Sequence, residues 1–278
     1  MRRLRQLKPG AWWSVTVRCA RAEFRLRPDE KRTNAVGFFL AKALTACPGV
    51  KLAAVTQMSN HIHLVLRDDA SELSNFMCRF EGPLAKSLNK LDTTRGQVFE
   101  RRFSAIEAID EDAVLDRIAY AAMNPVQAGL VRKMQDWPGL LVWPGERKGL
   151  TFGREPPHGK PESYALTLAH DLFTPEEVAS LKEEIEQRTA EVHRERGDVP
   201  FLGPRRVLAQ NVFDAPAHPK RSRMPLCHAS RLEHWWAHLK EWRVFTEAYR
   251  VASQAFRAGD WSARFPDFSF RPWTPTFA

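Results

Sequence analysis

The pattern of apolar and polar side chains predicts four strands in the first half of the chain, from alternation in two of them and from a short apolar segment at residues 52–58. The clearest is residues 60–67 (NHIHLVLR), in which successive side chains point to opposite faces. One face carries Ile62, Leu64 and Leu66. The other face carries His61, His63 and Val65. The remaining strands are predicted at residues 13–19, 52–58 and 99–109.

Apolar side chains spaced three and four residues apart predict three helices among these strands. The first follows Pro28-Asp29-Glu30 and ends at Pro48-Gly49. The second runs over residues 71–91, and its internal Gly82-Pro83 pair predicts a kink or a split. The third begins at Asp110 and is expected to end at Pro125, because a residue before proline is disfavoured in the α region.

The order of these elements predicts the fold class. It is β-α-β-β-α-β followed by one more helix. We therefore expect an α+β protein with a ferredoxin-like antiparallel sheet and helices on one face. The histidine strand should be central in the sheet and face the third helix.

A change in composition divides the chain. Residues 1–143 form the predicted α+β domain, and residues 144–172, rich in glycine and proline, are predicted to be a linker. Residues 173–278 are expected to be mostly helical. Thr174-Pro175-Glu176-Glu177 has the residues of a helix start, and a last long helix carries an aromatic stripe from Trp235 to Tyr249. That stripe favours a packing face over a platform for stacking bases.

Composition and charge narrow the classes of function. The 278 residues are 44% hydrophobic, and no apolar run approaches the ~20 residues that span a membrane. The formal net charge of +9 favours a polyanionic partner, although a weakly basic enzyme without one would also fit. Four scattered cysteines and no apolar signal core predict a reduced, cytoplasmic protein.

Two groups of residues are candidates for chemistry. His61 and His63 point the same way in a strand, roughly 6–7 Å apart along the chain, so they could hold one divalent ion or lie on a solvated face. Tyr120 shares a helix face with Arg117 and Asn124, away from the apolar stripe. Tyr120 could equally be an ordinary amphipathic surface residue. Neither group decides the function alone.

Together, the two groups resemble the single-tyrosine HUH transposases, and most of all the REP-associated tyrosine transposases. His61-Ile62-His63 is similar to the HUH motif of histidine, hydrophobic residue and histidine. Tyr120 followed by residues 124–131 (NPVQAGLV) is similar to the tyrosine motif, and residues 96–103 (GQVFERRF) fit the family pattern between the two. The resemblance covers roughly residues 10–140.

The resemblance implies a function and roles for individual residues. Tyr120 would attack single-stranded DNA and form a covalent 5′-phosphotyrosine, while His61, His63 and Asn124 hold Mg²⁺ or Mn²⁺. The expected substrate is single-stranded DNA that carries palindromic hairpins. The protein would lie at the nucleoid when it is bound to DNA. A monomer is favoured over a dimer. Weaker candidates for DNA contacts are Arg2, Arg3, Arg5, Arg101, Arg102 and Arg117.

Three other readings remain open. One is a catalytically silent, domesticated DNA-binding protein of the same fold, although His61, His63, Tyr120 and Asn124 are all intact. Another is a different HUH enzyme, such as a plasmid relaxase or a rolling-circle replication initiator. The third is an RNA-binding sheet, which needs aromatic side chains on its central strands. The histidine strand has none, but Trp12 and Trp13 lie on the first strand.

Overall fold

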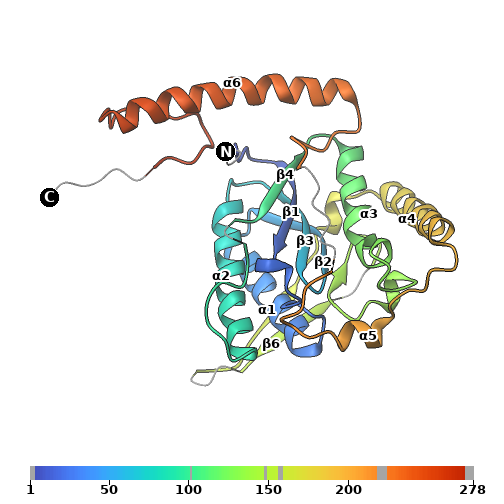
Figure 1. Ribbon diagram of the computed structural model, residues 1–278. Coiled ribbons are helices and arrows are strands. Elements are labelled where there is room, and N and C mark those ends of the chain that lie inside the picture. The colour runs from blue at the N-terminus through green and yellow to red at the C-terminus, as the bar shows by residue number, and fades with distance from the viewer. Residues whose placement is uncertain (1–3, 101, 147–148, 156–158, 218–223, 273–278) are drawn as a thin grey trace.

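The protein is described by a computed structural model that covers residues 4–100, 102–146, 149–155, 159–217 and 224–272. One five-stranded antiparallel sheet forms its centre, with helices on both faces (Figure 1). Its strands are β1 (Ala11–Arg18), β2 (Val50–Gln57), β3 (His61–Asp68), β4 (Ser104–Ala108) and β5 (Leu141–Val142). The first three helices are α1 (Glu30–Ala46), α2 (Leu73–Leu91) and α3 (Glu111–Gln127).

The strand order β4-β1-β3-β2-β5 puts the histidine strand β3 in the middle. This confirms the predicted α+β, ferredoxin-like sheet and its central strand. Two details differ from the prediction. β4 begins at Ser104, and Phe99 makes only an isolated bridge with Cys19. The fifth strand, β5, has two residues, which is too short to give an alternating pattern.

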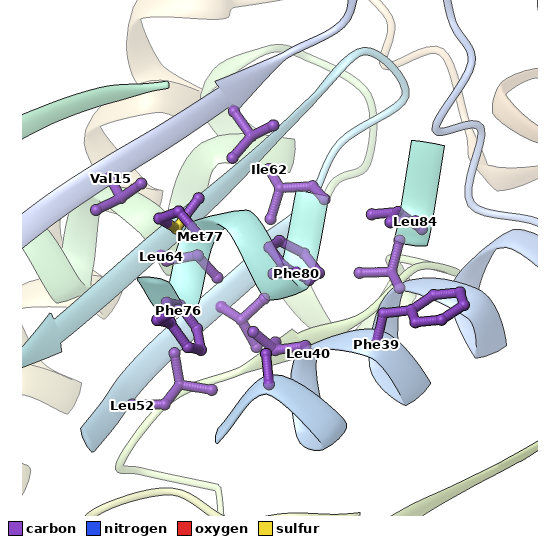
Figure 2. Close-up of a cluster of buried hydrophobic side chains, with 14 of the residues drawn as sticks. Val15, Phe39, Leu40, Leu52, Ile62, Leu64, Phe76, Met77, Phe80 and Leu84 are labelled. Atoms are coloured by element: carbon purple, nitrogen blue, oxygen red, sulfur yellow. The ribbon is translucent and has the colours of Figure 1, made fainter. Parts of the chain in front are cut away.

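Helices α1 and α2 cover one face of the sheet, as the β-α-β-β-α-β order requires. Ile62, Leu64 and Leu66 of β3 point into this layer and are fully buried in the core that α1 and α2 complete (Figure 2). The labelled contacts include Ile62, Leu64, Leu40, Phe76 and Phe80. Burial of apolar area of this kind is the main stabilising contribution to a folded domain.

Helix α3 covers the opposite face. Val65 of β3 and Ala54 of β2 are buried there with Ile118, Ala122 and Val126 of the helix. The central strand is thus buried on both sides. Its histidines share the face that α3 covers, so the tyrosine helix and the histidine strand face each other as predicted.

The ends of the helices follow side-chain caps, whereas two internal prolines do not end them. Asp110 caps α3 by accepting a hydrogen bond from Ala113 N. Helix α2 is not split at Pro83, because Phe80 and Leu84 on either side are buried in the same core. Helix α3 passes Pro125 and ends at Gln127, because Val126 is still buried against the sheet. In both helices, tertiary packing outweighs the local effect of proline.

Residues 144–172, predicted to be a linker, contain a hairpin instead. Strands β6 (Leu150–Arg154) and β7 (Glu162–Leu166) pair with each other and pack against α1. Tyr164 contacts Phe38 with ring centroids 5.4 Å apart, and Phe152 fills the space beside Gly37. These strands were not predicted, because their short apolar alternation is surrounded by glycines and prolines, which are typical of a linker. The division of the chain into domains stays a prediction.

The C-terminal region is helical, as predicted, with α4 (Pro175–Arg196), α5 (Pro204–Leu208) and α6 (Leu232–Arg257). Thr174 and Glu177 form the predicted capping box at the start of α4, which packs on α3. Helix α6 lies beyond β4 and beside the N-terminal segment, where Lys8 pairs with Glu241 (Figure 1). The aromatic stripe of α6 is only partly buried, with Phe245 buried and Trp236 exposed. Within the described ranges, no helix is long and apolar enough to cross a bilayer.

Replacing Leu64 with alanine should lower the free energy of unfolding by about 3 kcal/mol, because the cavity would lie in the centre of a fully buried strand. Urea unfolding followed by circular dichroism measures the change. Leu232→Ala, at a position 71% exposed on α6, is the matched control and should change stability by no more than about 0.5 kcal/mol. Equal effects in both variants would contradict the described core.

Candidate active site

His61 and His63 lie near the start of β3, on the face of the sheet that α3 covers. Their ring centroids are 4.7 Å apart, and the rings meet edge to face. The side chain of His63 is buried and that of His61 is half-buried. The pair therefore does not lie on an open, solvated strand face.

Tyr120 reaches this pair from α3. Its ring centroid lies 5.4 Å from that of His63, again edge to face. Asn124, one helical turn later, is buried and hydrogen-bonds through its side chain to His61. The structure thus brings together His61, His63, Tyr120 and Asn124, which the sequence placed on separate elements.

Two neighbours that sequence reasoning missed orient the imidazoles. Thr16 Oγ1 lies 3.2 Å from His63 Nδ1, because β1 and β3 pair with Thr16 opposite His63. Asn60 Oδ1 lies 2.7 Å from His61 Nδ1, and its amide nitrogen donates to Ala22 O, which fixes that orientation. Thr16 could have been found only from the pairing of β1 with β3, and the sequence pattern does not give that pairing. These contacts leave His63 Nε2 for another partner.

Burial controls the charge of both imidazoles. It lowers the pKa of His61 to about 3, and the cation of Arg18 adds to this effect, while the hydrogen bond with Asn124 opposes it. Burial also lowers the pKa of His63 well below 6.5, with His61 and Arg18 contributing in the same direction. Both rings are therefore neutral at pH 7, the state that can donate a lone pair to a metal ion.

The donor set fits a divalent ion. His63 Nε2 is buried without a hydrogen-bond partner, which is costly unless another group occupies that direction. With His61 and the side-chain oxygen of Asn124, it gives two imidazoles and one amide, leaving coordination positions for phosphate and water. Within the described ranges, no group of three or more histidine, cysteine, aspartate or glutamate side chains could hold a metal. A site built on these two imidazoles would need a third ligand of another kind, and Asn124 stays the predicted one.

Two arginines bring positive charge to the site. The guanidinium of Arg117 lies 4.8 Å from the centre of the Tyr120 ring, a cation–π contact. Arg18, opposite His61 in the β1–β3 register, is exposed beside the histidines. Sequence reasoning selected Arg117 but missed Arg18, whose position depends on strand pairing.

Of the other predicted DNA contacts, Arg5 lies against Phe103 and the core under α1 and α2. Arg5 donates to Phe103 O and stacks on the Phe103 ring. Burial and the neighbouring Arg102 lower the pKa of Arg5 to about 10. Arg102 is exposed. Three predicted contacts lie outside the described residues: Arg2, Arg3 and Arg101.

The neutral histidines predict how stability depends on pH. Below pH 6.5, the unfolded chain binds protons that folded His61 and His63 do not, so the free energy of unfolding should fall between pH 7 and pH 5. A His61→Asn/His63→Asn variant should show a shallower fall, and His228, whose pKa burial lowers to about 4, accounts for part of the remainder.

Urea unfolding at several pH values measures this slope, and histidine ring NMR measures the individual groups. The rings of His61 and His63 should not titrate between pH 8 and pH 5. A midpoint near 6.5 for either ring would contradict the described burial.

Comparisons with solved structures give relatives of low sequence identity. No protein-family model and no curated protein matches the sequence. A REP-associated tyrosine transposase bound to a REP hairpin is 19% identical, with a TM-score of 0.41 over 50% of this chain and 81% of that chain. A candidate transposase from Deinococcus radiodurans R1 is 14% identical, with a TM-score of 0.30 over 43% of this chain and 95% of that chain.

A third solved structure is a bacterial tRNA(His) guanylyltransferase-like protein in complex with ATP. It is 14% identical to this chain, with a TM-score of 0.36 over 66% of this chain and 92% of that chain. The structural neighbours thus include transposases. With every TM-score below 0.5, the argument for function comes from the sequence motifs and the site itself.

Proposed function

We propose that the protein is a transposase-like, metal-dependent nuclease that cleaves and rejoins single-stranded DNA. The observation that carries the proposal is the position of Tyr120, whose ring lies 5.4 Å from that of His63 beside the His61–His63 pair. Together with the order of the HUH and tyrosine motifs, this brings a nucleophile next to a donor set for a divalent ion.

Tyr120 is the nucleophile in this proposal. Its phenol oxygen attacks phosphorus, a new P–O bond forms to the tyrosine, and the bond to the 3′ oxygen breaks. The phenol loses its proton, and the leaving oxygen gains one as a 3′-hydroxyl. The resulting 5′-phosphotyrosine keeps the bond energy, so attack by another 3′-hydroxyl rejoins DNA without an added energy source.

His61, His63 and Asn124 would hold Mg²⁺ or Mn²⁺. When bound, the ion would offset the negative charge that develops on the phosphate oxygens. Thr16 and Asn60 keep the two imidazoles oriented, and burial keeps them neutral. Arg117 and Arg18 add two cations that can contact the phosphate before and during attack.

The substrate and the setting belong to the same proposal. The formal net charge of +9 suits a nucleic acid. Single-stranded DNA next to palindromic hairpins is the substrate that the motif resemblance favours. The protein would then act in the cytoplasm at the nucleoid, as a monomer. A silent DNA-binding relative of the same fold is the second possibility, and the experiment below separates the two.

Wild-type protein should form a covalent adduct with single-stranded DNA that contains the palindromic repeats around its own gene. Incubation with Mg²⁺ or Mn²⁺, followed by a denaturing gel, should show a shifted band that disappears with chelator. Tyr120→Phe should form no adduct, because it lacks the attacking oxygen while keeping the ring that contacts His63.

Tyr164→Phe is the matched control. Tyr164 lies in the β6–β7 hairpin against α1, so losing its hydroxyl should leave adduct formation unchanged. Tight binding of the repeats without an adduct, with either Mg²⁺ or Mn²⁺ present, would contradict the catalytic proposal and favour the silent DNA-binding protein.

A further inference from the structure

Helix α4 of the C-terminal region makes an ion pair with the helix that carries Tyr120. Arg188 Nη2 lies 2.6 Å from Asp116 Oδ1, across 72 residues of sequence. Arg188 is also held by Glu184, one turn earlier on α4, at 2.6 Å from its Nε. The guanidinium of Arg188 is therefore fixed at both ends.

Asp116 shares its carboxylate between two arginines. Oδ1 accepts from Arg188, while Oδ2 accepts from Arg117, with Nε of Arg117 at 2.8 Å. Arg117 in turn lies over the ring of Tyr120. A continuous chain of contacts thus runs from α4 to the proposed nucleophile, through Arg188, Asp116, Arg117 and Tyr120.

The charges along this chain of contacts are complementary. Burial opposes ionisation of Asp116, but its hydrogen bonds and attraction to Arg188 and Arg117 hold its pKa below the ordinary value. Asp116 is thus a carboxylate between two cations, and the group of three carries a net charge of one positive unit. Without Arg188, Asp116 would keep only its bonds from Arg117 among the contacts described, and the Asp116–Arg117 pair would lose its anchor on α4.

Arg188 is not needed to dock α4 against α3. Leu181 and Ile185 of α4 are buried in the core cluster that also contains Ile118 of α3. These apolar side chains supply the packing area, whereas the side chain of Arg188 is about a quarter exposed. A partly exposed ion pair contributes little to stability, so its effect on the site can be separated from its effect on the fold.

We propose that Arg188 is a positioning residue of the active site, which acts through Asp116 to hold Arg117 over the Tyr120 ring. The C-terminal region would then control the orientation of the phenol that attacks DNA. This inference rests on the proposed function for its effect on rate, but the placement of the Tyr120 ring can be measured without DNA.

The first measurement is NMR of the full-length protein with ring-labelled tyrosine. The chain has three tyrosines, so Tyr120→Phe assigns the Tyr120 signals. Arg188→Met and Asp116→Asn should each shift these signals, and the double variant should show no further shift, because both changes break the same chain of contacts. Arg194→Met, which removes an exposed arginine from the same helix, should leave them unchanged.

The second measurement is the rate of adduct formation at saturating DNA. Arg188→Met should slow it roughly ten- to a hundredfold, because the nucleophile is misplaced, while DNA affinity in the Tyr120→Phe background stays the same. Arg188→Lys should recover part of the rate, since an ammonium can still bond to Asp116. Arg194→Met should match the wild type.

The outcomes distinguish this inference from the proposed function. Shifted Tyr120 signals with no adduct from the wild type would support the positioning role and overturn the nuclease. Unchanged Tyr120 signals in Arg188→Met, with wild-type thermal stability, would overturn the positioning role whether or not adducts form. A loss of DNA affinity equal to the loss of rate would identify Arg188 as a binding residue and also overturn it.

Discussion

The two-sided burial of β3 is the constraint on which the rest of the structure depends. Because its side chains alternate, one face can enter the core under α1 and α2 while the other faces α3. A slip of one residue in its pairing would place histidines in the apolar core and Leu64 against the helix of Tyr120. The same register that builds the core therefore places His61 and His63 beside Tyr120, the proposed nucleophile.

Burying polar groups at this face of the sheet costs free energy, and the proposed cation site would account for that cost. His63 Nε2 is buried without a partner, and neutral imidazoles are kept from protonation by the surrounding protein. A structure selected for stability alone would satisfy or replace such a group. A buried ring nitrogen without a partner, beside a second imidazole and an amide, is consistent with the proposal that these side chains hold a cation.

The sequence predicted those features that depend on local patterns. Alternation predicted β1 and β3, a short apolar segment predicted β2, and capping residues predicted the start of α4. It failed where tertiary packing decides, as in the helix that continues past Pro125 and the hairpin of β6 and β7. In the site, motifs identified His61, His63, Tyr120 and Asn124. Thr16, Arg18 and Arg188 depend on strand register or helix packing, which motifs do not contain.

Besides α4, another C-terminal segment lies close to α3. The segment around His228 pairs in parallel with the end of β4, where His228 N donates to Glu107 O and Ile109 N donates to His228 O. Opposite Ala108, His228 lies within electrostatic reach of Arg117 and Asp116. Two separate C-terminal segments thus approach the same pair on α3. Both approaches bear on Asp116 and Arg117, which supports the proposal that the C-terminal region helps to hold Arg117 over the Tyr120 ring.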